Sequence, residues 1–179
     1  MPDKNFPKWI FPAGIIAIIA GLAFIPSIEE PVVSVIEKNI IWPIKYGNIS
    51  QWWPSIQSIA AKYGISPAFL AAEMKQESNG NPNAVSSTGA IGLLQIEPST
   101  GMSECGLSAT QLYDPTTNLN CGAKYLADIY SKYGSYEYAA AGYYGGPGTS
   151  PVSQKGTPTV QQYVSSVMNH FNNIQSFLV

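Results

Sequence analysis

Apolar residues recur at three- and four-residue spacing along most of the chain beyond Gln51, a pattern typical of amphipathic helices. The first such segment, 52–63, ends at Gly64, and glycine suits the left-handed conformation that often follows a helix. Ser66 then precedes a proline and a second apolar segment that reaches Ser78, so we expect Ser66 to cap this helix. The sequence therefore predicts two consecutive helices separated by a short turn.

The rest of the chain continues the helical pattern. A loop rich in Asn, Ser and Gly is predicted over 79–89, and a short apolar stretch follows at 90–96. Further helices are predicted over 114–134, 136–144 and 159–177. No segment alternates apolar and polar residues over a sustained length, so the sequence predicts a mainly α-helical domain.

The amino-terminal region differs, because residues 9–25 contain no charged side chain. A helix of this length rises about 25 Å, and the addition of 26–28 brings it near the ~30 Å hydrocarbon core of a bilayer. Lys4 and Lys8 precede it, which predicts a cytoplasmic amino terminus and an exported carboxy-terminal domain. A cleaved signal peptide is the main alternative, and the lack of a polar face argues against a buried core helix.

These patterns divide the chain into three parts. Residues 1–28 are predicted to be a membrane anchor or signal segment, 29–50 a spacer, and 51–179 the functional domain. Pro31 and Pro43 interrupt the spacer, which leaves room for one short helix. We therefore expect an anchored protein whose domain lies on the extracytoplasmic side, or a secreted one if the segment is cleaved.

The chain carries little charge. Charged residues make up 11% of it, against about 25% in typical domains, and the net charge is −2. All 9 basic residues are lysines, and they form no cluster that would mark a phosphate-binding face. Nucleic acid is therefore not expected as a partner.

Cys105 and Cys121 are the 2 cysteines of the chain. Together with the 1 histidine they cannot supply an ordinary zinc site, so no metal is expected. In an exported domain the pair is expected to form a disulfide, which would stabilise the fold by roughly 3 kcal/mol for a loop of this size. Two buried free thiols are the alternative.

Three segments carry the residues with chemical potential. They are 76–86 (QESNGNPNAVS), 89–100 (GAIGLLQIEPST) and 140–148 (AAGYYGGPG). Together they resemble the motifs of lytic transglycosylases with the soluble-transglycosylase (SLT) type of catalytic domain, relatives of goose-type lysozyme. The segment 112–122 (LYDPTTNLNCG) resembles that family's link between its second and third motifs. The resemblance covers about 55–171.

Glu77 is the strongest candidate for a catalytic group. It lies at the end of a predicted apolar helix, and a partly desolvated carboxyl group there can act as a general acid near neutral pH. Glu73, one turn earlier on the same face, is expected mainly at the surface. Alternatively, Glu73 is the acid itself or raises the proton affinity of Glu77. Glu97 and Glu104 are the other carboxylates near the motifs, and Glu97 is the candidate base if water attacks the substrate.

The resemblance implies that Glu77 is the catalytic acid and that six residues bind substrate: Ser78, Gly92, Leu94, Gln95, Tyr143 and Tyr144. Gly92 would let the backbone approach the sugar, Gln95 would offer its amide, and the Tyr143 hydroxyl would lie near the reacting acetamido sugar. Ser78 is expected to hold the catalytic carboxyl by a hydrogen bond or, alternatively, to bond the backbone. Tyr144 departs from the family, which usually has Asn there.

The fold implied by the resemblance is a compact, lysozyme-like helical domain, and the substrate is the glycan of peptidoglycan. The expected reaction cleaves the MurNAc–GlcNAc β-1,4 bond and forms 1,6-anhydro-MurNAc, with no cofactor. A muramidase that hydrolyses the same bond is one alternative. A non-catalytic wall-binding subunit of a phage, secretion or conjugation apparatus is another, and a phage role would make the protein virion-associated.

Overall fold

The computed structural model describes residues 42–178. The predicted anchor, 1–28, and most of the predicted spacer, 29–50, lie outside the described residues. Across 42–178, no helix combines the length and apolarity that a membrane crossing requires. One compact unit begins at Tyr46 and contains all of the motif segments.

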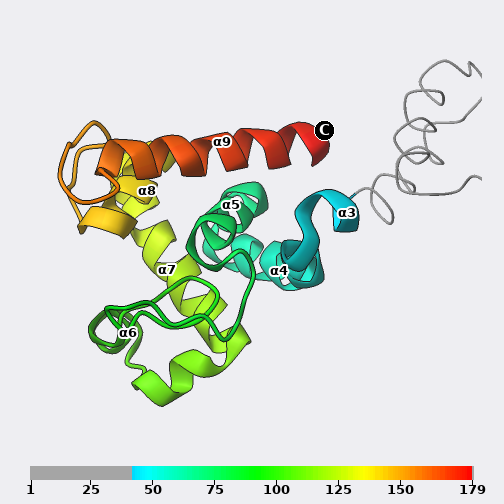
Figure 1. The fold of residues 1–179 in the computed structure, drawn as a ribbon, viewed down its shortest axis with the longest axis horizontal. Helices are drawn as coiled ribbons and strands as arrows, with labels where there is room; N and C mark the ends of the chain where they lie inside the picture. Colours follow the sequence, from blue (N-terminus) through cyan, green and yellow to red (C-terminus); the bar gives the residue numbers. More distant parts are fainter. Residues whose placement is uncertain (1–41, 179) are drawn as a thin grey trace, which may run out of the picture. The chain divides into compact units, whose positions relative to one another are not determined.

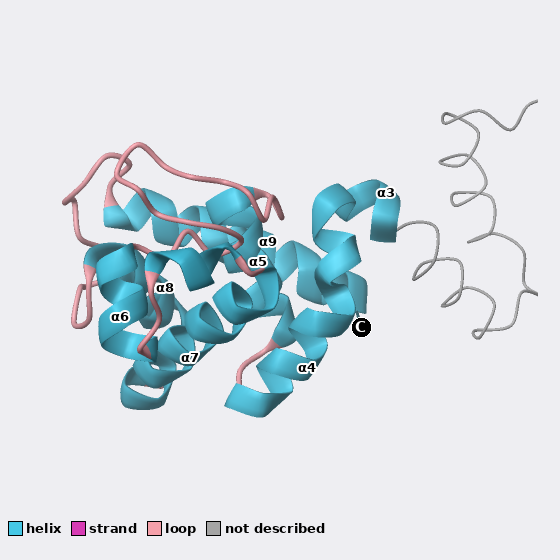
Figure 2. Cartoon of the chain, turned by 90° about the horizontal axis from the view of Figure 1, so that it is seen from below, coloured by secondary structure: helices cyan, strands magenta, loops and turns pink. Residues whose placement is uncertain are grey.

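The unit is built from helices, as the sequence predicts (Figures 1 and 2). The described elements, with 3₁₀ helices written η, are α3 (Trp42–Tyr46), η2 (Gly47–Trp52), α4 (Trp53–Tyr63), α5 (Pro67–Ser78), α6 (Pro98–Cys105), η3 (Ala109–Tyr113), α7 (Pro115–Tyr133), α8 (Tyr136–Gly145) and α9 (Val160–Leu178). The mainly α-helical fold class is thereby confirmed for the described residues, and it fits the lysozyme-like fold that the resemblance implies.

Side-chain caps and glycines set the helix ends. The Ser66 hydroxyl accepts a hydrogen bond from Phe69 N at 3.4 Å, which caps α5 as predicted. Asp114 caps α7 in the same way, through Thr117 N at 2.7 Å. Gly134 ends α7 in the left-handed conformation, with φ of 64°. These local signals explain why the predicted helices agree closely with α4, α5, α7, α8 and α9, whereas α6 and η3 are not predicted.

Helix α5 lies at the centre of the unit, between α4 and α9, and α8 packs against both α7 and α9 (Figure 1). Residues 68–74 of α5 are all buried, so this helix has apolar surroundings on nearly every side. An aromatic cluster joins three helices: the Phe69 ring of α5 stacks on Tyr136 of α8 at 4.4 Å, and Phe171 of α9 meets both edge-on. This packing holds the amino-terminal end of α5 against α9.

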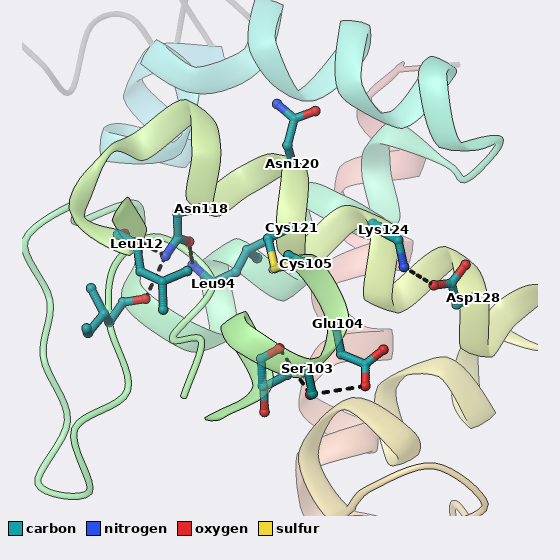
Figure 3. Close-up of a disulfide and its surroundings, with 12 residues drawn as sticks. Leu94, Ser103, Glu104, Cys105, Leu112, Asn118, Asn120, Cys121, Lys124 and Asp128 are labelled. Atoms are coloured by element: carbon teal, nitrogen blue, oxygen red, sulfur yellow. Dashed lines mark hydrogen bonds and ion pairs between the residues drawn. A yellow bond between two sulfur atoms is a disulfide. The ribbon is translucent and has the colours of Figure 1, made fainter. Parts of the chain in front are cut away.

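The predicted disulfide is present. Cys105, the last residue of α6, is bonded to Cys121 in α7, and their Cα atoms are 5.8 Å apart (Figure 3). The bond closes a loop with a sequence separation of 16 residues, which includes η3. It therefore ties the segment that follows the second motif to the long helix α7.

Candidate active site

Glu77 lies in the last turn of α5, where the helix leaves the core. Its side chain is half-buried, and one carboxyl oxygen, Oε1, accepts a hydrogen bond from the Tyr163 hydroxyl of α9. A carboxyl group at the boundary between core and solvent can both hold a proton and present it to a bound molecule. Glu77 therefore has the setting of a general acid.

Glu73 lies one turn earlier and corrects a prediction. The sequence favours a surface position, but the side chain is 0% exposed, because α9 covers this face of α5. Its Oε2 atom is 2.7 Å from the Tyr163 hydroxyl oxygen. Its Oε1 atom is buried and has no hydrogen-bond partner among the residues that the structure describes.

Burial shifts the proton affinity of both carboxyl groups. Desolvation raises the pKa of Glu73 from 4.5 to about 8, a hydrogen bond donated by Tyr163 to the ionised carboxylate would oppose this shift, and the nearby Glu77 adds to it. Desolvation also raises the pKa of Glu77 from 4.5 to about 7, again opposed by the hydrogen bond from Tyr163. Both groups can therefore hold a proton near neutral pH, and Glu73 is the one that holds it more firmly.

Tyr163 is the residue of this cluster that the sequence does not reveal. It is 3% exposed, and burial and the two carboxyl groups raise the pKa of its hydroxyl well above 10. In the sequence it belongs to the apolar stripe of α9 with Val160, Val164 and Val167, so it has the pattern of a packed core residue. The one available signal is chemical, since a buried tyrosine hydroxyl needs a polar partner.

The third-motif tyrosines have different roles. Tyr143 is half-buried, and its hydroxyl donates to the Leu94 carbonyl at 2.7 Å, which joins α8 to the second motif. The Tyr144 ring stacks on Tyr163 with centroids 4.5 Å apart and an angle of 13°. Its hydroxyl donates to the Pro158 carbonyl at 2.8 Å. Tyr144, at the position where the family usually has Asn, therefore packs its ring against the ring of Tyr163.

Ser78 and Gln95 direct their polar groups to the backbone. The Ser78 hydroxyl donates to the Leu93 carbonyl at 2.7 Å, so its partner is the second-motif loop and not the Glu77 carboxyl. The Gln95 amide donates to the carbonyls of Ala84 and Gly92, both at 3.0 Å. Both residues thus hold the loop in place beside the end of α5.

Asn118 of α7 holds the second-motif loop in place through hydrogen bonds. This side chain is 0% exposed; its amide group donates to the carbonyls of Ile91 and Leu112 and its oxygen accepts from Leu94 N (Figure 3). Gly92, with φ of 79°, lies against this amide, and a Cβ atom there would be 2.5 Å from Asn118 Nδ2. The Leu94 side chain is also fully buried. Gly92 and the side chain of Leu94 therefore serve the packing of this loop.

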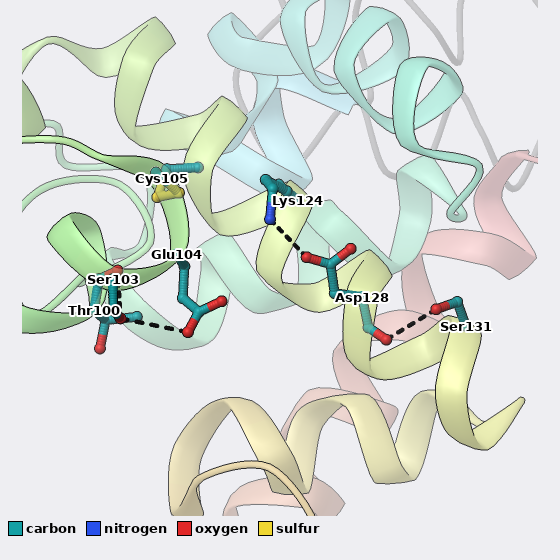
Figure 4. Close-up of polar contacts among 8 residues, drawn as sticks. Thr100, Ser103, Glu104, Cys105, Lys124, Asp128 and Ser131 are labelled. Carbon is teal, nitrogen blue, oxygen red and sulfur yellow. Dashed lines mark hydrogen bonds and ion pairs between the residues drawn. A yellow bond between two sulfur atoms is a disulfide. The ribbon is translucent and has the colours of Figure 1, made fainter.

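The other two carboxylates near the motifs pair with neighbours. Glu97 accepts a hydrogen bond from the Thr88 hydroxyl at 2.6 Å. Glu104 accepts one from Ser103 at 3.3 Å, on the α6 side of the molecule that also shows the Lys124–Asp128 ion pair (Figure 4). Within 42–178, no group of three or more His, Cys, Asp or Glu side chains is arranged to hold a metal ion.

A hollow of about 620 Å³ adjoins the tyrosine stack. Tyr144 of α8 and Val160 of α9 line it, and most of the other lining residues come from the loop between these helices, including Thr149, Ser153 and Lys155. The hollow is lined by polar and apolar groups together, which suits a ligand with hydroxyl groups and apolar ring faces.

Comparison with known proteins identifies relatives of this arrangement. The family model described as "Transglycosylase SLT domain" matches residues 54–165, a range that includes both buried carboxyl groups and Tyr163. A protein named "Transglycosylase" from Enterobacteria phage PRD1 is 35% identical over 122 residues, which is 68% of this chain. The chain covers 43% of that phage protein.

Solved structures show the same fold. The 70-kDa soluble lytic transglycosylase of Escherichia coli aligns with a TM-score of 0.62 and 26% identity, over 70% of this chain and 24% of that protein. A complex of the 70-kDa soluble lytic transglycosylase with bulgecin A gives 0.62 and 25%, over 70% and 24%. An inactive mutant of lytic transglycosylase Slt from Pseudomonas aeruginosa gives 0.63 and 23%, over 92% and 29%.

Proposed function

The chain belongs to the transglycosylase SLT domain family, and on that premise we propose that it is a peptidoglycan lytic transglycosylase with Glu77 as its catalytic acid. The observation that carries the proposal is the Glu77 carboxyl itself. It is half-buried at the end of α5, is held by Tyr163, and has its pKa raised by desolvation to about 7. Such a group is protonated often enough at neutral pH to act as an acid and is ionised easily enough to act as a base.

The reaction uses this one residue twice. Glu77 protonates the bridging oxygen after the muramoyl unit, and the acetamido oxygen of the substrate stabilises the cationic centre. The Glu77 carboxylate then takes the proton of the C6 hydroxyl, whose oxygen closes the 1,6-anhydro ring. The proton on Glu77 is restored at the end of each cycle, and no water is consumed.

The position of the second carboxyl group favours this reaction over hydrolysis. An inverting hydrolase needs a carboxylate that activates water on the opposite face of the sugar. Glu73 is fully buried behind Glu77, so it cannot contact a bound water and sugar together. Glu97 is engaged by Thr88 at 2.6 Å. The burial of Glu73 supports the transglycosylase and leaves Glu97 as the remaining candidate base for a muramidase.

The glycan strand is proposed to lie along the face formed by Glu77, the second-motif loop and the hollow beside Tyr144. The Tyr143 hydroxyl donates its hydrogen to the Leu94 carbonyl. The lone pairs of the Tyr143 hydroxyl oxygen remain available to accept a hydrogen bond from a sugar hydroxyl. Tyrosine rings offer flat apolar surfaces to sugar rings, and few charged groups are needed for a neutral polymer backbone. The low charge of the chain agrees with this kind of ligand.

Product analysis of a peptidoglycan digest by the full chain tests the proposal. The expected muropeptides end in 1,6-anhydro-MurNAc and are lighter by one water than reducing products, which mass spectrometry reads directly. Predominantly reducing ends would reassign the enzyme as a muramidase, with Glu97→Gln as the next variant to assay. Binding to cell walls without any digestion would instead favour a non-catalytic wall-binding subunit.

Residues 1–28 hold the catalytic unit at the extracytoplasmic face of a membrane in this proposal. Lys4 and Lys8 and the uncharged stretch 9–25 support it. Amino-terminal sequencing of the protein from both the membrane and the released fraction separates an intact anchor from a cleaved signal. Protease digestion of intact spheroplasts, which should remove the catalytic unit, tests its side of the membrane.

A further inference from the structure

The fully buried carboxyl of Glu73 has no role in the reaction described above. It lies among side chains of 0% exposure on α5, including Leu70, Ala72 and Met74. Its Oε1 atom has no hydrogen-bond partner among residues 42–178. A bare carboxylate oxygen in such surroundings is much less favourable than the carbonyl oxygen of a neutral acid. The geometry therefore points to a protonated Glu73.

The hydrogen bonds around Tyr163 independently require a proton on one of the two carboxyl groups. Its hydroxyl oxygen is in hydrogen-bond contact with Glu73 Oε2, at 2.7 Å, and with Glu77 Oε1. A tyrosine hydroxyl has one proton, so it can donate to one of these two oxygens. The other bond needs a proton from a carboxyl group, which must then be a neutral acid. At least one of Glu73 and Glu77 is therefore protonated whenever both bonds exist.

Burial selects Glu73 as the proton donor, because it is the more deeply buried of the two. Among residues 42–178, the titratable groups that interact with both carboxyls are Tyr143 of α8 and Tyr163 of α9. Their pKa values lie well above 10, so they are neutral near pH 7 and do not oppose this choice. The charged groups of the elements packed on this side bond elsewhere: Lys62 of α4 to Asn120, and Lys75 of α5 to Asn79, with His170 of α9 near Lys75.

We propose that Glu73 is a positioning residue that stays a neutral acid, donates its proton to the Tyr163 hydroxyl oxygen, and thereby directs the Tyr163 hydrogen to Glu77 Oε1. This inference rests on the proposed function of Glu77. The proton of Glu77 is then confined to its other oxygen, Oε2, from which it can reach the bridging oxygen of the substrate. Glu73 keeps its own proton throughout the cycle, so the proton balance of the reaction is unchanged.

The reverse arrangement would be unproductive. If Glu73 were ionised, its carboxylate would accept the Tyr163 hydrogen, and the Tyr163 oxygen would accept the proton of Glu77. That proton would then point into the core and away from the substrate. The neutral state of Glu73 thus decides which way the shared hydrogen bonds run.

An infrared measurement tests the neutral state without any substrate. In the full-length Glu77→Gln chain at pH 7, the carbonyl band of a protonated carboxylic acid is expected, and it should vanish when Glu73→Gln is added. Exposed carboxyl groups are ionised at this pH and do not contribute. The absence of the band in the Glu77→Gln chain would show that Glu73 is ionised, and the inference would be overturned.

Two neutral replacements of Glu73 test the positioning role. The amide of Glu73→Gln can donate to Tyr163 as the acid does, so this variant should lose less than about tenfold in kcat and keep the alkaline limb of its pH profile. Glu73→Met has similar length but no donor, and we expect a further three- to tenfold loss, about the worth of one neutral hydrogen bond. In a Tyr163→Phe background the Gln and Met variants should be equal, because the effect passes through the hydroxyl.

Several outcomes would overturn the inference. If Glu73 were ionised in the active enzyme, Glu73→Gln would remove a like charge beside Glu77 and move the alkaline limb to lower pH. Equal rates for Gln and Met in the presence of Tyr163 would show that the donor is unimportant. A wild-type chain that digests no peptidoglycan would instead overturn the proposed function, and the infrared band would still decide the protonation of Glu73.

Discussion

Carboxyl groups occupy two contrasting regions of this molecule. At the α5–α9 contact, Glu73 and Glu77 are withdrawn from water and share one tyrosine hydroxyl. On the α6–α7 surface, Asp128 pairs with Lys124 at 2.7 Å, with side chains 57% and 41% exposed (Figure 4). In the first environment the carboxyl groups can stay protonated near neutral pH, whereas in the second the carboxylate forms an ordinary ion pair in solvent. Chemical reactivity here follows from desolvation and a chosen hydrogen-bond partner, since the functional groups are the same.

The largest effect is expected from Glu77→Gln. Because this change removes the proton that is delivered to the leaving oxygen, glycan cleavage should fall by at least about 100-fold, within the 10²–10⁴-fold range of general acid catalysis. Turbidity loss of a peptidoglycan suspension measures it, with circular dichroism to show that the fold is retained. Glu104→Gln, on the solvent-facing side, is the matched control, and a loss below tenfold in Glu77→Gln would refute the assignment.

Loss of the disulfide should have the next largest effect, and on stability alone. Replacement of both Cys105 and Cys121 by Ser should lower the free energy of unfolding by about 3 kcal/mol. The unfolded chain gains conformational freedom because no covalent bond links the two residues, which are 16 positions apart. Urea unfolding of the oxidised wild type and the double variant measures the difference. Activity per folded molecule should remain, since the bond lies outside the carboxyl cluster; a fall in step with Glu77→Gln would contradict this separation.

The buried carboxyl groups should also make stability depend on pH. The pKa of Glu73 is raised from 4.5 to about 8, so the folded state binds more protons than the unfolded state between these values. Stability is therefore highest below about pH 4.5 with respect to this group and falls as the pH rises toward 8. Glu73→Gln removes the ionisable group, and its advantage over wild type should reach about 2 kcal/mol or more at pH 8.

Urea unfolding of both proteins at pH 5 and pH 8 measures this advantage. Two stability profiles that run parallel between these pH values would show that Glu73 ionises normally in the folded protein.

Tyr163→Phe should reduce activity by about tenfold, the cost of one well-placed hydrogen bond to the acid. The bond lowers the pKa of Glu77, so its removal should raise that pKa and shift the alkaline limb of the pH–rate profile upward. Rates measured from pH 5 to 9 give both quantities. A downward shift would mean that Tyr163 stabilises the protonated acid instead.

The smallest effect belongs to the solvent-exposed pair. Lys124→Ala should change the free energy of unfolding by only about 0.3–0.5 kcal/mol, because both partners are hydrated and the bridge spans four residues of one helix. Thermal unfolding at low and high salt resolves it. A loss above 1 kcal/mol would mean that the ion pair is linked to interior packing.

The sequence predicts most of the fold because local chemistry determines it. Ser66 and Asp114 cap helices through backbone groups three residues away, and Gly134 ends one by its own conformation. The pair of cysteines likewise leaves one partner for each, given an oxidising compartment. Glu77 was found through the motif that it belongs to, and its place at the end of α5 follows from the helix signals around it.

The rest of the site depends on contacts between distant parts of the chain. Tyr163 bonds carboxyl groups 86 and 90 residues away, and no periodicity in α9 distinguishes it from a packed aromatic residue. For Glu73 the sequence predicts a surface position, because glutamate is rarely buried, but residues 68–74 of its helix are all buried. For Ser78 the sequence leaves two partners open, the catalytic carboxyl and the backbone, and the structure shows the backbone partner, the Leu93 carbonyl of the second-motif loop. Tertiary packing decides each of these cases.

The contact between Gly92 and Asn118 has a consequence for engineering the enzyme. Because Gly92 has no side chain, the Asn118 amide fits against it. The same amide bonds the backbone of the second-motif loop, to which Gly92 belongs. A side chain at 92 would displace hydrogen bonds of Asn118. A smaller residue at 118 would leave the Leu112 carbonyl and the Leu94 N–H without the bonds that Asn118 supplies, and the Ile91 carbonyl would keep only its bond from Ile96 N. A library that varies the loop for new glycan specificities should therefore treat the two positions as one joint choice and diversify the residues around them.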